Sequence, residues 1–259
     1  MSYFSSDVAL GRRLEHAEAA GVRKYASFTP GAEYLDTMGG CAVFAGVGGF
    51  ATQAIGLGMD GPVTEAELDA VEEFYRARGS VVPLNLSPLA HATLWELVMK
   101  RPYTIREIEN LMVAQASACE VGNSVARRTQ PGEERTWSSV VAQGFSGLED
   151  PPPMFDEMLA PTASISECYA CYDGERMVAG GAMNIEDGVA LLYGDATLIS
   201  HRGRGFQTAI IQARLNRAIE AGCEYAMATV NAGSGSHRNY ERLGFRLMYT
   251  RVNVKREWT

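Results

Sequence analysis

Apolar and polar positions alternate along this chain with two different spacings, which together predict an α/β fold with a mixed sheet. Apolar residues three and four positions apart, with glycine and proline at the breaks, predict helices over residues 8–20, 64–79, 90–99, 137–145, 154–160, 205–221 and 236–243. Short apolar runs between turn residues predict strands over residues 41–50, 51–57, 81–86, 103–113, 121–129, 164–172, 177–185, 189–199, 225–230 and 245–254.

Local signals fix two of these elements. Thr64-Glu65-Ala66-Glu67 fits a capping box, in which the Thr and Glu side chains satisfy amide groups at a helix start. Asp173-Gly174 is a turn signal that joins the predicted strands at 164–172 and 177–185 into a hairpin.

The length of 259 residues suits one large domain or two modest ones. A change in the order of predicted helices and strands near residues 115–122 favours two domains. We therefore expect one domain over residues 1–120 and a second over residues 121–259.

Composition and charge exclude several classes of protein. With 46% hydrophobic and 21% charged residues, the chain is not a disordered one. Its net charge of −8 argues against nucleic acid as a partner and favours a cationic or amine-bearing one. The stretch 202–246 differs, because its seven arginines face only three glutamates, and an anionic ligand is expected there.

Two stretches resemble sites that the chain is not expected to have. Residues 41–59 carry no charge, but five glycines favour two buried strands over a membrane span. Cys168 and Cys171 form a C-x-x-C pair in a predicted strand, where residues three apart face opposite sides, so no metal site is expected. The start of the chain has no apolar secretory segment, and the five cysteines are an odd number, which together indicate a cytoplasmic protein.

The most informative segment runs from Asp195 to Gln207. A predicted strand enters a turn with Gly203 and Gly205, and the turn leads directly into a helix. Such a turn aims free backbone N–H groups at one point, and the helix dipole adds positive potential, which is suited to a phosphate group. Arg202 and Arg204 add positive charge beside it.

This segment and a second one resemble the GNAT superfamily of acyl-CoA-dependent N-acetyltransferases. Arg202-Gly203-Arg204-Gly205-Phe206-Gln207 is similar to the family's R/Q-x-x-G-x-G/A pyrophosphate loop. Tyr240-Glu241-Arg242-Leu243-Gly244-Phe245, about 35 residues later, is similar to its Y-E-K-L-G-F-type segment. The order of elements from residue 121 to 254 also agrees, so the resemblance covers about half the chain.

The resemblance implies a function and a set of site residues. It implies transfer of an acetyl group from acetyl-CoA to a primary amine by direct attack in a ternary complex, between two central strands that splay apart. Tyr240 is the implied general acid to the CoA thiolate, since a phenol of pKa ~10 holds its proton until a thiolate of pKa ~8.5 forms. The implied acetyl-CoA-binding residues are Thr197, Leu198, Arg202, Gly203, Arg204, Gly205, Phe206, Gln207, Thr208, Asn231, Ser236 and Asn239.

The chain departs from the family pattern at two places. Gln207 stands where Gly or Ala is usual, which crowds the start of the helix. Gly233-Ser234-Gly235-Ser236 lengthens the interval after Asn231, so that Ser236 or Asn239 is an alternative to Asn231 in binding the donor.

The general base is open at this point. Asp195 lies two residues before Thr197, hence on the same strand face, and is our candidate, with Glu186 and a chain of waters as alternatives. His201 and His237 fall at turns and are interpreted as local structural residues.

The first half resembles the degenerate N-terminal half of tandem-GNAT proteins. It has no R-x-x-G-x-G loop before its helix at residues 64–79, so we expect it to bind no CoA. Gly46-Val47-Gly48-Gly49-Phe50-Ala51 formally fits a dinucleotide-binding G-x-G-x-x-A, but no helix follows it directly, which disfavours an oxidoreductase. The alternative to an enzyme is a CoA-binding sensor or interaction module without catalysis. We expect a small amine as substrate, no membrane partner, and a monomer or homodimer.

Overall fold

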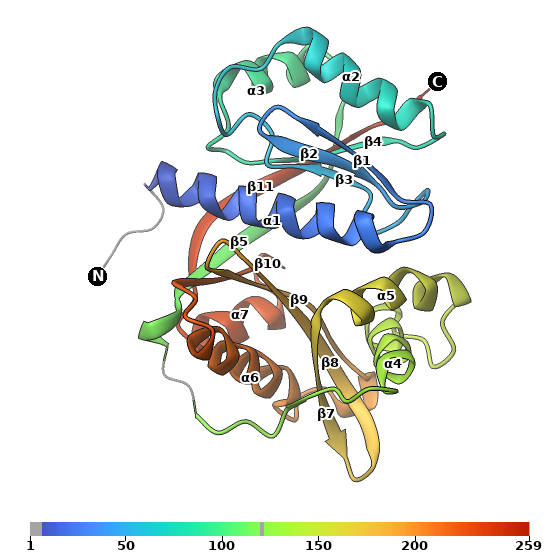
Figure 1. Ribbon diagram of the computed structural model, residues 1–259, viewed down its shortest axis with the longest axis vertical. Coiled ribbons are helices and arrows are strands. Elements are labelled where there is room, and N and C mark those ends of the chain that lie inside the picture. The colour runs from blue at the N-terminus through green and yellow to red at the C-terminus, as the bar shows by residue number, and fades with distance from the viewer. Residues whose placement is uncertain (1–6, 120–121, 259) are drawn as a thin grey trace. The chain divides into compact units, whose positions relative to one another are not determined.

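The computed structural model describes residues 7–119 and 122–258. The chain folds into two compact units (Figure 1). The first comprises Met1–Leu111 and Leu247–Thr259, and the second Met112–Arg246. The expected domain division at residue 120 differs from these bounds, because the chain changes unit inside one strand and returns to the first unit at the end.

The first unit is built from three helices and a mixed sheet. Its elements are α1 (Val8–Phe28), β1 (Glu33–Thr37), β2 (Gly40–Phe44), β3 (Gln53–Ile55), α2 (Glu65–Arg76), β4 (Val82–Leu86), α3 (Ala92–Met99), the larger part of β5 (Thr104–Gln115) and nearly all of β11 (Arg246–Arg256). The strand order is β1-β2-β3-β4-β11-β5. The pairing of β3 with β4 is parallel and consists of a single residue pair, Ala54 with Leu84.

Helices cover both faces of this sheet. α1 packs on one face, where Ala19 and Ala26 meet Cys41 and Ile55. α2 and α3 pack on the other face in a larger cluster that includes Leu68, Leu84 and Leu94 (Figure 1). The capping box is present as predicted, with the Thr64 side chain accepting from the Glu67 amide and the Glu67 side chain accepting from the Thr64 amide.

The second unit repeats the same plan. Its elements are the end of β5, η2 (Ala116–Ala118), β6 (Arg127–Arg128), α4 (Glu134–Ser146), α5 (Pro153–Ile165), β7 (Glu167–Asp173), β8 (Arg176–Glu186), β9 (Val189–Thr197), η3 (Ile199–His201), α6 (Phe206–Glu220), β10 (Tyr225–Asn231) and α7 (Gly235–Arg242). The strand order is β5-β10-β9-β8-β7-β6. In both units, three consecutive strands are followed by a helix, a strand and a helix.

Two hydrophobic clusters lie on opposite faces of the second sheet. α6 and α7 cover one face and α4 and α5 the other (Figure 1). Cys171 belongs to the first cluster and Cys168 to the second, as the strand period predicts. Burial raises the pKa of the Cys171 thiol to about 11 and that of the Cys168 thiol to about 12. The C-x-x-C pair therefore supplies core residues.

The strands β9 and β10 separate toward their carboxyl ends. They pair in parallel only from Val189–Tyr225 to Leu191–Met227, and both continue beyond that point. On the other side of β9, Tyr193 pairs with Ala182 and Ala196 with Gly180, which leaves two residues of β9 opposite one of β8. One of those two is Gly194, whose φ of 70° suits the irregularity. This is the splayed pair of strands that the resemblance implies.

The structure confirms most of the predicted elements and corrects others. The expected strand over residues 121–129 is wrong where it is described: only Arg127 and Arg128 form a strand, and residue 121 lies outside the described residues. Ser124 instead donates a hydrogen bond to the Ala209 carbonyl at 2.6 Å, which holds this segment against α6. β1 was not expected, and α1 continues past residue 20 because Tyr25 and Ala26 are also buried.

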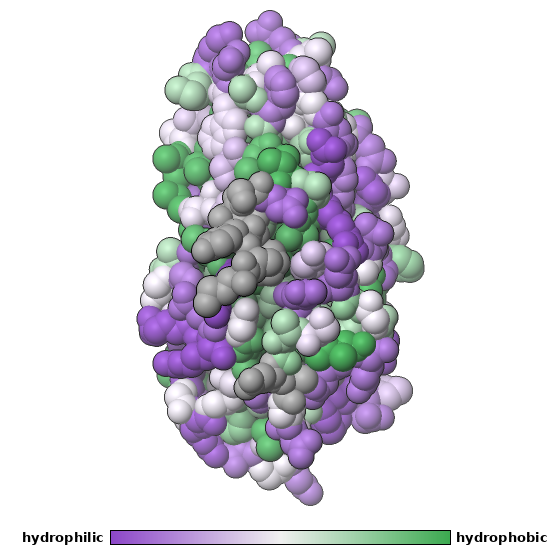
Figure 2. All heavy atoms as spheres, turned by 90° about the vertical axis from the view of Figure 1, so that its left-hand side faces the viewer, coloured by the Kyte–Doolittle hydropathy of each residue, from purple (hydrophilic) through white to green (hydrophobic). Residues whose placement is uncertain are grey.

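The uncharged stretch over residues 41–59 forms β2, β3 and glycine-rich connections, as expected. Among the described residues, none of the helices has the length and apolar character that crossing a bilayer requires. On the face drawn in Figure 2, hydrophilic residues separate the hydrophobic ones into small groups. Gly46–Ala51 lie in the connection between β2 and β3, so the formal dinucleotide motif has no helix after it.

Candidate functional site

The turn between η3 and α6 is open to solvent and rich in free backbone amides. Gly203 and Gly205 have φ values of 76° and 82°, a backbone conformation that favours glycine. A Cβ atom at either glycine would meet no other atom within 4 Å. Gly205 is the N-cap of α6, and no side chain of the described residues caps the first turn. These N–H groups and the positive end of the helix dipole are available to an external anion.

The corresponding helix of the first unit shows the opposite arrangement. The amides at the start of α2 are satisfied by Thr64 and Glu67, and Glu65 adds a second negative charge there. The Gly58 amide in the preceding loop donates to the Met38 carbonyl at 2.8 Å. Neighbouring side chains of this loop, Leu57 and Met59, are buried in the core. The first unit therefore lacks an open anion site at this position.

Both arginines of the turn are bonded within the protein. Arg202 donates to the Gly144 carbonyl at 2.7 Å and to the Thr197 carbonyl at 3.3 Å. Arg204 donates to Asp173 at 2.8 Å, and this hydrogen bond lowers the pKa of the Asp173 carboxyl. The arginines thus hold the turn to α4 and to the β7–β8 hairpin, while their positive charge remains beside it.

A buried ion pair lies between β9 and α6. Arg214, fully buried on α6, forms a salt bridge with Asp195, which is the second residue of the irregularity in β9. The guanidinium group also donates to the carbonyls of Ala182 at 2.7 Å, Tyr193 at 3.1 Å and Ile210 at 3.3 Å. Each of these bonds compensates part of the cost of removing the charge from water.

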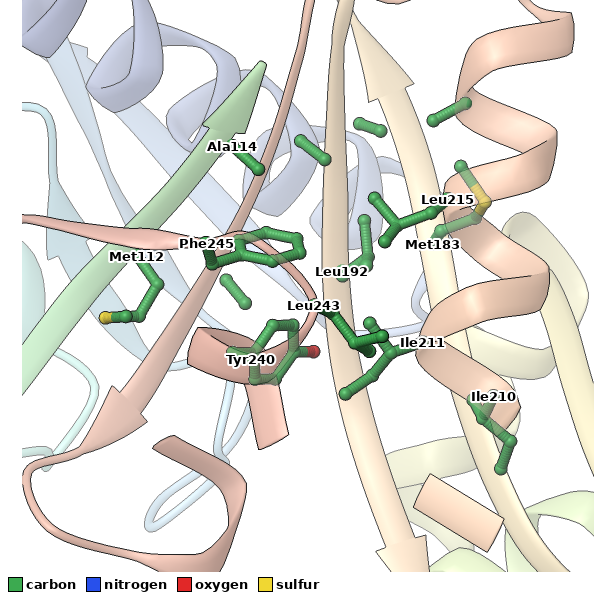
Figure 3. Packing of buried hydrophobic residues seen from close by; sticks show 14 of the residues in the cluster. Met112, Ala114, Met183, Leu192, Ile210, Ile211, Leu215, Tyr240, Leu243 and Phe245 are labelled. Atoms are coloured by element: carbon green, nitrogen blue, oxygen red, sulfur yellow. The ribbon is translucent and has the colours of Figure 1, made fainter. Parts of the chain in front are cut away.

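Tyr240 reaches this ion pair from α7. Its hydroxyl donates to Asp195 Oδ2 at 2.7 Å, and the side chain is 1% exposed. The ring packs edge-on against Phe245, with centroids 4.9 Å apart. Figure 3 shows the hydroxyl directed away from Met112 and toward the strands beside α6. Burial raises the pKa of Tyr240 well above its usual value, and the nearby Asp195 charge raises it further.

Gln207 joins the remaining polar residues. Its amide nitrogen donates to Ser236 at 2.8 Å and to Asp195 at 3.4 Å, and its oxygen accepts from Asn239 at 2.8 Å. The crowding expected at this position is therefore an ordered contact between α6 and α7. It brings together four residues that the sequence placed in the site separately.

The other predicted donor-binding residues lie around the turn without joining this network. Thr197 is the last residue of β9, and Thr208 lies in the first turn of α6. The Leu198 amide donates to the Val178 carbonyl at 3.0 Å, and its own carbonyl accepts from the His201 amide at 2.8 Å. Both backbone groups of Leu198 take part in hydrogen bonds within the protein, and its role in donor binding stays a prediction. Asn231 ends β10 with an exposed side chain, and Phe206 is partly buried beside both hydrophobic clusters.

The alternatives for the base occupy different surroundings. Glu186 pairs with Val189 at the far end of β9, six residues or about 20 Å along the strand from Asp195. His201 bonds to Ser200 at 2.8 Å, and His237 accepts from the Gly233 amide at 3.0 Å, so both stabilise turns. Asp195 is at the centre of the site, but both its oxygens already accept hydrogen bonds.

Arg214 is the one central residue that the sequence interpretation missed. A signal was present, because this arginine lies between Ile210, Ile211 and Leu215 on the buried face of an amphipathic helix. A charge at such a position requires a buried partner. The partner is nineteen residues back along the chain and across a turn, and the pattern of the helix alone does not identify it.

Comparisons with known proteins agree with this geometry. Residues 135–245 match the model of the Acetyltransferase (GNAT) family. Among solved structures, the chain is similar to a GCN5-related N-acetyltransferase from Kribbella flavida, with a TM-score of 0.72 and 18% identity over 96% of each chain. It is also similar to a tandem GNAT protein from the clavulanic acid biosynthesis pathway, with a TM-score of 0.60 and 11% identity over 96% of this chain and 94% of that one.

A third structure, a GCN5-related N-acetyltransferase from Sphaerobacter thermophilus, has a TM-score of 0.58 and 17% identity, covering 87% of this chain and 76% of that one. At these identities the solved structures establish the fold alone, including that of the first half. Among the curated proteins, no sequence matches the chain.

The buried ion pair needs a glycine at position 181 of β8. A Cβ atom there would lie 2.7 Å from Ile210 Cγ2 and 2.8 Å from Asp195 Oδ1. We expect Gly181→Ala to lower the free energy of unfolding by about 1–3 kcal/mol, because the pair must shift to admit the methyl group. The control is Gly235→Ala, where the added Cβ meets no atom closer than 4.0 Å. Denaturant titration measures both variants, and equal stability would show that Gly181 is not constrained by the pair.

Proposed function

Residues 135–245 form a domain of the acetyltransferase (GNAT) family, and from this premise we propose that the protein transfers an acetyl group from acetyl-CoA to the primary amine of a small molecule. The observation that carries the proposal is the uncapped start of α6 beside the separated strands β9 and β10. Acetyl-CoA supplies the thioester, and the protein supplies the binding site and the proton transfers.

The anionic part of the donor fits the turn from Arg202 to Thr208. Its glycines leave room for close approach, and the amides of Phe206, Gln207 and Thr208 lie in the first turn of α6. Arg202 and Arg204 contribute positive potential without having to leave their present partners. Among the described residues, no other helix start shows both a glycine N-cap and a first turn without a capping side chain or an acidic residue.

The acyl arm fits between β9 and β10, where the two strands are no longer paired. Backbone groups of Thr197 at the end of β9 are proposed contacts, together with Asn231 at the end of β10 and Ser236 and Asn239 of α7. Ser236 and Asn239 are bonded to Gln207, so their contribution to donor binding includes a rearrangement of that side chain.

The proposed reaction is direct attack of a neutral amine on the thioester carbonyl. The new C–N bond forms, the C–S bond breaks, and the sulfur leaves as a thiolate that requires a proton. Tyr240 is the proposed donor, because a phenol of ordinary pKa ~10 is protonated at neutral pH. Burial raises the pKa of Tyr240 further, which makes loss of the proton without replacement unfavourable. The role of Asp195 as base stays a prediction, and its contacts with Arg214 and Tyr240 support a different role, argued below.

We propose that the first unit binds no acyl-CoA. The carboxylates of Glu65 and Glu67 at the start of α2 repel a phosphate, and the capping box already satisfies the amides of Thr64 and Glu67. The net charge of −8 supports a cationic acceptor, since a negative surface raises the local concentration of a protonated amine.

A second candidate function is binding of CoA without catalysis, in a sensor or interaction module. The observation in its favour is that Tyr240 is buried and already bonded to Asp195. Release of free thiol from acetyl-CoA in the presence of a panel of small amines separates the two functions, because a sensor binds the donor and releases none.

The anion site is tested by placing a negative charge in the turn. We expect Gly203→Glu to abolish acetyl-CoA binding, measured by titration calorimetry, because the carboxylate occupies the site and repels the phosphates. Gly222→Glu is the matched control: Gly222 follows the other end of α6, its φ of 72° imposes the same strain, and its surroundings are equally open. Retained affinity in Gly203→Glu would refute the site.

The acid role is tested by removing one oxygen atom. We expect Tyr240→Phe to lower turnover at least tenfold while the dissociation constant for acetyl-CoA changes less than about threefold. Tyr169→Phe is the control, since Tyr169 is a buried tyrosine of the same hydrophobic cluster. Unchanged turnover in Tyr240→Phe would contradict the assignment.

A further inference from the structure

The buried pair of Arg214 and Asp195 has no role in the reaction as proposed so far. Its cost is nevertheless high, because both charges lie out of water. Three backbone carbonyls and one carboxylate oxygen fix the orientation of the guanidinium group. A pair that serves packing alone has no need of a tyrosine hydroxyl on its remaining oxygen.

The two oxygens of Asp195 face different partners. Oδ1 accepts from Arg214, and Oδ2 accepts from Tyr240 at 2.7 Å and from Gln207 at 3.4 Å. The direction of the Tyr240 O–H bond is thereby set by a carboxylate that is itself held by a buried arginine. This chain of contacts passes through β9, α6 and α7, all within the second unit.

The surroundings of Tyr240 restrict how it can act as an acid. If the hydroxyl gave up its proton and received none, a phenolate would stand beside the Asp195 carboxylate in a buried site. Burial and that carboxylate both oppose the phenolate, and only Arg214 favours it. A proton must therefore reach the Tyr240 oxygen as another one leaves.

We propose that Asp195 and Arg214 are positioning residues that hold Tyr240 for a coupled proton exchange, in which Tyr240 receives a proton from the attacking amine as it gives its own to the departing sulfur. The C–N bond forms and the C–S bond breaks. The hydroxyl proton leaves its hydrogen bond to Asp195 and moves to sulfur, while the amine proton moves to the Tyr240 oxygen and restores the hydrogen bond to Asp195. Tyr240 ends the reaction as it began, and no charge is left on it. Asp195 keeps its charge throughout and is not the base. This inference rests on the proposed acetyl transfer.

A mutant cycle between positions 195 and 240 tests the proposal. We expect Asp195→Asn to lower kcat at least tenfold, with the KM for acetyl-CoA changed less than about threefold. In the Tyr240→Phe background, the same Asp195→Asn change should cost less than threefold in kcat, because the residue it positions is already gone. Losses that multiply would show that the two residues act independently, and would overturn the positioning role.

Arg214 is tested in the same cycle. Arg214→Gln should lower kcat in the presence of Tyr240 and change it less than threefold in Tyr240→Phe, and Arg214→Lys should restore part of the activity by keeping the charge. Glu167→Gln is the matched control, since Glu167 pairs with Arg217 one turn further along α6. Circular dichroism checks that each variant folds, and where Arg214→Gln does not fold, the Asp195→Asn cycle decides alone.

The pH profile of kcat gives an independent readout. The charged groups facing the Tyr240 hydroxyl are Asp195 from β9 and Arg214 from α6, while Phe245 and Gln207 are neutral. In Asp195→Asn the positive charge of Arg214 has no carboxylate partner, and it lowers the pKa of Tyr240. The kcat of this variant should therefore fall at the alkaline end of pH 7–10. In the unmodified protein, Tyr240 keeps its proton over this range and causes no such fall in kcat.

The outcomes separate the two proposals. If Tyr240→Phe has no effect on turnover, the acid role proposed for the domain fails. If Tyr240→Phe lowers turnover but Asp195→Asn leaves kcat and its pH profile unchanged, or if the two losses multiply, the acid role stands and the positioning roles of Asp195 and Arg214 are overturned.

Discussion

The second unit is organised around the buried ion pair between Arg214 and Asp195, an interaction with a large desolvation free energy. An unpaired charge at either position would cost several kcal/mol, so every neighbouring element has to accommodate both groups. Gly181 leaves the space that the guanidinium group occupies, and the irregularity at Gly194 allows two residues of β9 to lie opposite one of β8. The same irregularity places Asp195 within reach of Tyr240. Features that look independent in the sequence therefore satisfy a single electrostatic requirement.

The two units use the same order of elements but treat the comparable helix start in opposite ways. In the first unit, Thr64 and Glu67 cap α2 with the chain's own side chains. In the second, Gly205 leaves the first turn of α6 uncapped, and the arginines beside it are held by Asp173 and the Gly144 carbonyl. The backbone amides at a helix start either bond to side chains of the same chain or remain available to a ligand, but not both. The charge distribution follows the same division, because residues 1–120 carry 15 acidic and 9 basic side chains, whereas residues 121–259 carry 16 and 14.

Sequence patterns predicted the structural features that depend on neighbouring residues. They failed for features that depend on contacts between residues far apart in the chain. The capping box at Thr64, the glycine turn before α6 and the opposite facing of Cys168 and Cys171 all follow from local spacing. The short β6 and the place of β11 do not, because they depend on which strand each segment meets: β11 pairs with β4 of the first unit. The role of Arg214 depends likewise on Asp195, which only the folded chain brings near.

The two departures from the family pattern are one structural feature. Gln207 lies at the start of α6, where the resemblance implies a small residue, and Gly233-Ser234-Gly235-Ser236 precedes and begins α7. Ser234 caps α7 by accepting from the His237 amide, which sets the start of the helix so that Ser236 and Asn239, three residues apart, both reach Gln207. A small residue at position 207 would leave these two side chains without that partner, and a shorter connection would remove Ser236 from it. Gln207 and the segment that begins α7 therefore form one set of contacts, and Asp195 joins it to the ion pair whose carboxylate accepts the hydrogen bond of the Tyr240 hydroxyl.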